Sequence, residues 1–160
     1  MQNNIRKTLG VLLMGLIGQG GAVAATHQAD IVVYGDASGG VTAAVQAARM
    51  GKSAILVSQY GHLGGLTSSG LGWTDIGNDA ILGGLSREFY HRLYKHYENP
   101  EAWTHQKRED YGNHWQGQPA LNPETELAST FEPSVAEAIF DAMISNPLLD
   151  KGRDKPAKDQ

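Results

Sequence analysis

The chain has 160 residues, of which 41% are hydrophobic, and this length and composition fit one ordinary domain with a buried core. Its formal net charge is -4 and its 13 Lys and Arg residues are spread thinly, which argues against nucleic-acid binding. The absence of cysteine excludes disulfides, thiolate metal sites and thiol nucleophiles. The six histidines lack the spacing of a metal site, so we predict no bound metal.

The first segment, residues 1–25, has the pattern of a secretory signal peptide. It has a positive start at Arg6 and Lys7, an apolar stretch of about ten residues, and the small-residue end GAVAA. An uncleaved membrane anchor is the alternative, but a stable span needs about twenty apolar residues. We therefore predict export to the periplasm or the medium, with no stable membrane insertion after cleavage.

Residues 30–58 predict a strand, a glycine turn, a helix and a second strand. The run DIVVY (30–34) is apolar without alternation, as in a parallel strand buried on both faces, and SAILVS (53–58) has the same character. Residues 41–50 have helical periodicity, and Gly51 can end that helix. The apolar face of the helix consists of Val41, Ala44, Val45 and Ala48. This order is typical of a parallel βαβ crossover.

The turn between the first strand and the helix has the character of a phosphate-binding loop. In such loops backbone N–H groups and the helix dipole point at the anion, and glycines permit the tight turn. In the pattern GxGxxG, Gly35 fills the first place and Gly40 the third, while Ala37 stands at the second. Because the match is imperfect, a plain turn without ligand remains the alternative. Asp36 adds a carboxylate to this turn, and we expect its side chain to face water.

The next segments predict a long functional loop and a helix. Residues 60–78 are rich in glycine and longer than an ordinary connection, which favours a loop that covers a ligand. Residues 79–97 predict a core helix capped by Asn78 or Asp79. Its apolar stripe consists of Leu82, Leu85, Phe89, Leu93 and Tyr97.

The remainder predicts a loop, a third helix and a polar tail. Residues 101–130 are polar, aromatic and irregular, so we predict a loop or small cap. A helix is expected from Pro133, a residue that suits the first helical turn. Its apolar side carries Val135, Ile139, Phe140 and Met143. Residues 146–160 form a charged tail without a strand pattern, which we interpret as divergent and as the mark of a truncation or frameshift.

A family resemblance rests on motifs that occur in order between about residues 29 and 145. These are the glycine turn, HLGGLTS, GLGWTDIGN, GGLSREFY and FEPSVAE. Together they resemble the N-terminal part of the FAD-dependent oxidoreductases sometimes labelled xanthan-lyase-like. The resemblance implies an α/β fold, the Rossmann-like βαβ start of an FAD/NAD(P)-binding parallel sheet, incomplete and with added helices. It divides the chain into a signal peptide (1–25), the N-terminal part of an FAD-binding domain (26–145) and a divergent tail (146–160).

The resemblance also implies which residues bind FAD. The turn would face the pyrophosphate, and the second glycine segment would close over the cofactor. The implied cofactor-binding residues are Gly35, Ala37, Ser38, Gly39, Gly40, Ser58, Gly64, Gly65, Leu66 and Thr67.

Four positions, in three places along the chain, depart from the family pattern. Asp36 and Ala37 replace a glycine and a threonine of the turn, and Ser69 stands where a glycine is usual. At the end of the second strand the family has a glutamate that accepts hydrogen bonds from the adenosine ribose, and Ser58 stands there. Loss of that carboxylate is the heavier deficit, because a hydroxyl is a shorter and uncharged acceptor.

These features predict the N-terminal FAD-binding portion of an exported FAD-dependent oxidoreductase with an unidentified small-molecule substrate. No catalytic residue can be assigned. His62 precedes the second glycine segment and is expected to be structural, whereas Trp73, Thr74 and Asp75 are candidates for a position near flavin or substrate. The alternative is a truncated, non-catalytic remnant or exported binding protein without productive FAD binding. An NAD-dependent dehydrogenase is disfavoured, because no acid ends the second strand.

Overall fold

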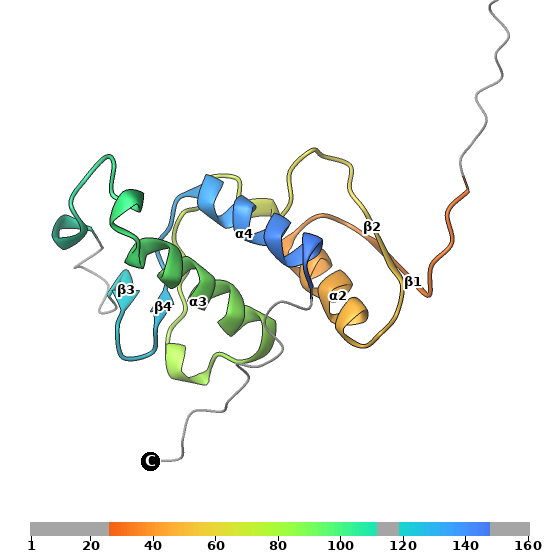
Figure 1. Cartoon of the computed structure of the whole chain (residues 1–160), viewed down its shortest axis with the longest axis horizontal. Coiled ribbons are helices and arrows are strands. Elements are labelled where there is room, and N and C mark those ends of the chain that lie inside the picture. Colours follow the sequence, from red (N-terminus) through yellow and green to blue (C-terminus); the bar gives the residue numbers. More distant parts are fainter. Residues whose placement is uncertain (1–25, 112–118, 148–160) are drawn as a thin grey trace, which may run out of the picture.

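The computed structural model describes residues 26–111 and 119–147. The predicted signal peptide lies outside them, as does most of the predicted polar tail. Figure 1 shows the arrangement of the described elements. In chain order the strands and α-helices are β1 (Ile31–Tyr34), α2 (Ser38–Arg49), β2 (Ala54–Val57), α3 (Gly84–Glu98), β3 (Leu121–Asn122), β4 (Leu127–Ala128) and α4 (Pro133–Ser145).

The predicted βαβ unit is confirmed. Strands β1 and β2 pair in parallel with Ile31 opposite Ala54 and Tyr34 opposite Val57, and α2 connects them. The helix begins at Ser38 rather than at Val41, because the glycines of the turn already adopt the first helical turn. It ends as predicted, with Gly51 in a left-handed conformation at φ +77°.

The expectation that both strands are buried on both faces is wrong for the described residues. Helix α2 packs against β1 and β2, yet Val32 is 61% exposed and Tyr34 is 70% exposed. Parallel strands are covered on both faces only when further strands and helices surround them. The described residues form a sheet of two strands, which leaves apolar side chains of β1 in solvent.

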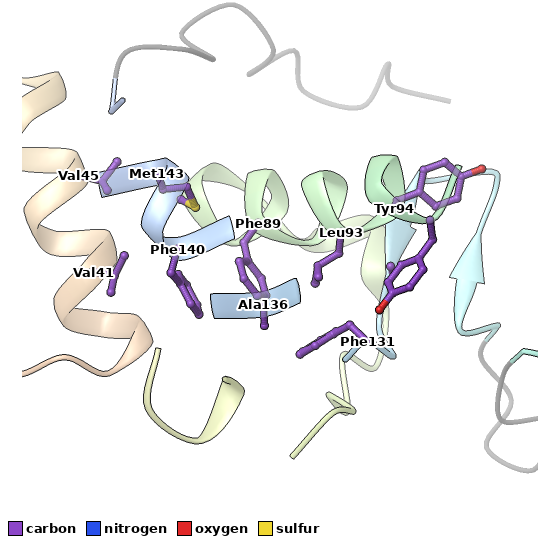
Figure 2. Packing of buried hydrophobic residues seen from close by; sticks show 11 residues of the cluster. Val41, Val45, Phe89, Leu93, Tyr94, Phe131, Ala136, Phe140 and Met143 are labelled. Atoms are coloured by element: carbon purple, nitrogen blue, oxygen red, sulfur yellow. The ribbon is translucent and has the colours of Figure 1, made fainter. Parts of the chain in front are cut away.

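The core lies among three helices rather than on the sheet. Helix α4 lies between α2 and α3, and the β3–β4 hairpin flanks α3 at the end away from β1 and β2 (Figure 1). Figure 2 shows the apolar side chains that converge there. The rings of Phe89 and Phe140 are stacked with centroids 4.5 Å apart, and Phe131 meets Phe89 edge to face. Burial of these aromatic side chains is the main apolar contribution to stability.

The two remaining predicted helices are confirmed with one shift of boundary. Helix α4 begins at Pro133 as expected, whereas α3 begins at Gly84 instead of residue 79. Asp79–Ile81 forms a separate 3-10 turn, and Asn78 caps that turn by accepting a hydrogen bond from the Ala80 N–H. The predicted stripe is buried in its second half, at Phe89, Leu93 and Tyr97.

The segment predicted as an irregular loop contains the β3–β4 hairpin. Each of its strands has two residues, which is too short to produce a periodic pattern in the sequence. Strand β4 of this hairpin is nevertheless buried against α3, since Leu127 is 1% and Ala128 is 0% exposed. Here tertiary packing, not local propensity, decides the structure.

A largely buried ion pair joins α2 to α3. The Arg49 guanidinium lies 2.7 Å from the Glu88 carboxylate, and Arg92 pairs with the same carboxylate at 2.7 Å. Arg49 also donates to the carbonyl oxygen of Pro147, just after α4. Burial alone would raise the pKa of Glu88, but the hydrogen bonds and charges of Arg49 and Arg92 outweigh it and leave that pKa lowered. The Glu88 carboxylate therefore links α2 to α3, and Arg49 also links α2 to the residues just after α4.

Candidate cofactor site

The glycine turn after β1 is closed tightly by backbone contacts. Gly35 has φ +126°, a conformation that favours glycine, and its N–H donates to the Val57 carbonyl at 2.9 Å. A Cβ on Gly40 would lie 2.1 Å from the carbonyl oxygen of Gly35. The turn itself thus requires glycine at the first and third places of the GxGxxG pattern, and these are the two places that this sequence fills.

The start of α2 provides backbone donors for an anion. Ala37 is the N-cap residue in an extended conformation, and no side chain caps the helix. The first N–H groups of an α-helix, here from Ser38 to Gly40, have no partner within the helix. A Cβ on Gly39 would meet nothing within 4 Å, so the space beside this residue is open. An uncapped helix start facing open space fits a phosphate group.

The second glycine segment lies directly beside this turn. The Gly64 N–H donates to the Asp36 carbonyl at 2.7 Å, and Ala37 and Gly64 form a parallel bridge. A Cβ on Gly65 would lie 3.1 Å from that of Ala37, so the two backbones are in close approach. The family resemblance implies that both segments belong to one site, and in the structure they are in contact.

The segment after Gly64 forms a single 3-10 turn, Gly65–Thr67. Leu66 within it is 76% exposed. Of the remaining cofactor-binding residues predicted from the sequence, Leu66 is exposed and Thr67 is partly buried, and both lie in the segment that borders the glycine turn.

Asp36 does not face water alone, which corrects the expectation from the sequence. The Ser58 hydroxyl donates to Oδ2 of Asp36 at 2.7 Å, and both residues are half-buried. This hydrogen bond lowers the pKa of the Asp36 carboxyl below its usual 3.8, so the group is ionised at neutral pH. The pairing of Tyr34 with Val57 brings the two residues together, because both follow the carboxyl ends of adjacent strands.

The four other residues considered in the sequence, which are His62, Trp73, Thr74 and Asp75, lie in two different surroundings. His62 is 75% exposed at its side chain, and its Nδ1 lies 2.6 Å from Oε1 of Glu137 on α4, in keeping with a structural role. Trp73 forms a bridge with Thr130, and the Thr74 N–H donates to the Ser129 carbonyl. Asp75 follows them and is exposed. Trp73 and Thr74 are thus fixed to the segment that precedes α4.

A separate hollow lies at the end of α3. Its volume is about 240 Å³, and its lining includes Glu132 and the side chains of Tyr97, Trp103 and Tyr111, whose rings contact one another. The Tyr97 hydroxyl donates to the Glu132 carboxylate at 2.6 Å and accepts from the Glu132 N–H at 2.8 Å. No residue predicted to bind a cofactor lines it. Among residues 26–111 and 119–147 no cluster of metal-ligating side chains is present.

The chain was compared with known protein families, with curated proteins and with solved structures. A family model described as FAD dependent oxidoreductase matches residues 30–153. The chain belongs to this family. A search of curated proteins and a search of solved structures each found no significant match.

The cofactor of FAD-dependent oxidoreductases is FAD, and the residues present fit its pyrophosphate. The open space beside Gly39, the uncapped start of α2 and the glycine that the turn requires at position 40 are compatible with a bound anion. In the part of the chain that the structure describes, no helix is both long and apolar enough to cross a membrane.

Proposed function

We propose that this chain is the N-terminal FAD-binding portion of an exported FAD-dependent oxidoreductase. The observation that supports the proposal most strongly is the contact between the two glycine segments, carried by the Gly64 to Asp36 hydrogen bond. It places the 64–67 segment beside the helix start in a chain whose family uses FAD.

In the proposed site each element has its own role. The N–H groups of Ser38, Gly39 and Gly40 would hold the pyrophosphate, with the dipole of α2 behind them. Residues 64–67 would border the cofactor, and the exposed Leu66 would provide apolar surface. When bound, FAD supplies the redox chemistry, and the protein orients it and tunes its electronics. We assign no catalytic residue to the chain.

The narrower resemblance to the xanthan-lyase-like group is part of the proposal and identifies no substrate, because one cofactor site supports many reactions. Export rests on the first 25 residues, with their positive start, apolar stretch and small-residue end. Mass spectrometry of the N-terminus after expression in a secreting bacterial host tests it. Cleavage after Ala24 or Ala25 supports export, whereas an intact N-terminus contradicts it.

The second candidate is a non-catalytic remnant or exported binding protein without productive FAD binding. The exposed apolar residues of β1 favour this alternative, because they lack the second covering layer of a complete parallel sheet. An NAD-dependent enzyme is less well supported, since the family model that matches the chain is that of FAD dependent oxidoreductases.

A titration of the purified chain with FAD separates these candidates. Flavin fluorescence and the circular dichroism of the protein are followed together, with NAD as the comparison ligand. Saturable FAD binding with retained or increased order supports the proposal. A folded chain that binds no FAD is the remnant, and preference for NAD favours the dehydrogenase.

A further inference from the structure

The same two parallel strands carry a carboxylate and serine pair at each end. At the amino ends, the Ser53 hydroxyl and the Ser53 N–H both donate to Oδ2 of Asp30 at 2.8 Å. At the carboxyl ends, the Ser58 hydroxyl donates to Oδ2 of Asp36 at 2.7 Å. In open parallel sheets ligands bind outside the carboxyl ends of the strands. The two pairs are chemically alike, and only the second lies at the ligand-binding end.

Dinucleotide-binding folds place an acid at the carboxyl end of the second strand, where its carboxylate accepts hydrogen bonds from the adenosine ribose. In this chain Ser58 occupies that position and has no charge. Its hydroxyl, however, holds the Asp36 carboxylate over the end of β2. The fold therefore has a carboxylate at the expected place, but the carboxylate comes from the loop after β1.

The Asp36 carboxylate has the capacity for such a role. An ionised carboxylate has about four lone-pair positions, so the bond from Ser58 leaves others for ribose hydroxyls. The Asp36 backbone is fixed on both sides, by the Gly64 N–H on its carbonyl and by the Gly35 to Val57 hydrogen bond before it. A fixed, partly exposed and charged acceptor forms stronger hydrogen bonds than a neutral one.

We propose that Asp36, oriented by Ser58, is the acceptor for the adenosine ribose hydroxyls of FAD and replaces the acid that usually ends the second strand. This inference rests on the proposed function, because it assigns a role within the same FAD site. It also explains why a loop that holds a phosphate contains a carboxylate. The bond to Ser58 draws that carboxylate to β2 while the helix start stays open for the anion.

The experiment compares Asp36→Asn with Asp30→Asn in the purified full chain. Each substitution removes one negative charge from a carboxylate that accepts from a serine of the paired strand. The dissociation constant for FAD is measured by flavin fluorescence, and circular dichroism confirms folding. We expect Asp36→Asn to weaken FAD binding about 10- to 100-fold, the effect of one charge-assisted hydrogen bond. Asp30→Asn should stay within about 2-fold of the wild type.

A second ligand makes the test specific for the ribose. With an FAD analogue whose adenosine ribose lacks both hydroxyls, the wild type and Asp36→Asn should bind equally, because the interaction partner is gone. If Asp36 instead repels the pyrophosphate, Asp36→Asn binds FAD more tightly than the wild type. If Asp36 is only a surface charge, its affinity is unchanged. Either result overturns the inference and leaves the FAD site intact.

A transplanted acid provides an independent variant. Asp36→Gly should weaken FAD binding, and adding Ser58→Glu to it should restore affinity to within about 3-fold of the wild type, because the acid returns to the end of β2. Failure of Ser58→Glu to restore any affinity contradicts the inference. If the folded wild-type chain binds no FAD at all, the proposed function fails first and the inference fails with it.

Discussion

Gly64 lies against the ring of Phe140, so that a Cβ at this position would be 2.5 Å from two of its ring carbons. The same glycine donates its N–H to the Asp36 carbonyl at 2.7 Å and has φ +105°. One residue thus connects the core of the three helices to the glycine turn. Helix α4 carries no residue predicted to bind a cofactor. Through Phe140 it nevertheless determines the position of the second glycine segment.

Gly64→Ala should therefore destabilise the protein strongly. The left-handed backbone costs about 1–2 kcal/mol for alanine, and overpacking against Phe140 adds about 1–3 kcal/mol. Urea unfolding of the variant measures the sum. Gly77→Ala is the matched control, because Gly77 has φ +68° with nothing within 4 Å of its Cβ position. Equal losses for both variants would show that the Phe140 contact contributes nothing.

The two glycines at the start of α2 should differ sharply in their tolerance of alanine. Gly40→Ala places a Cβ 2.1 Å from the Gly35 carbonyl oxygen and should open the turn, which lowers both stability and FAD affinity. Gly39→Ala places its Cβ in open space and should leave the free energy of unfolding unchanged or raise it by up to about 1 kcal/mol. Thermal unfolding of the two variants checks this. Similar midpoints would contradict the tight turn.

Glu88 should make the protein sensitive to acid. Its folded-state pKa is lowered from the usual 4.5, so its contribution to stability is present above that value and is lost as the pH falls through the lower folded-state pKa. Glu88→Gln should cost about 3 kcal/mol at neutral pH by leaving Arg49 and Arg92 without their carboxylate. The difference from the wild type should shrink below about pH 4.5.

Urea unfolding across this pH range measures the effect, and Glu98→Gln is the control. Glu98 pairs with Lys95 at 2.8 Å on the surface, with both side chains more than 40% exposed. Solvent screens such pairs, so its removal should not move the unfolding midpoint. An acid response of Glu88→Gln identical to that of the wild type would contradict the role of the buried ion pair.

Removal of one buried hydroxyl group should leave the stability of the protein unchanged or raise it. Thr130 Oγ1 is buried and has no hydrogen-bond partner in the described part of the chain, which is a cost to the folded state. Thr130→Val keeps the shape and removes the polar atom, so it should leave stability unchanged or raise it by about 1 kcal/mol. Thermal unfolding of the variant measures this, with Thr125→Val as the comparison, since the Thr125 hydroxyl donates to Asp79 at 2.7 Å. A loss at Thr130 as large as that at Thr125 would show a partner for Oγ1.

The sequence predicted those parts of the fold that local pattern determines. The βαβ order and the helix from Pro133 were accessible, because apolar periodicity and glycine turns are local signals. The contact between the two glycine segments was expected only from the family resemblance. The β3–β4 hairpin and the exposure of β1 were not, since each depends on which distant segments supply neighbours. The bond between Asp36 and Ser58 was missed for the same reason. It follows from the register of β1 and β2, which determines the residues that meet beyond the strand ends.

The most direct test of the FAD site is amide hydrogen exchange of the purified chain with and without FAD. The two glycine segments form one site, so peptides that cover residues 35–42 and 61–70 should gain protection together at the same FAD concentration. Peptides over residues 97–111, around the separate aromatic hollow, should stay unchanged. Protection confined to that hollow, or to one glycine segment alone, would contradict a cofactor site built from both segments.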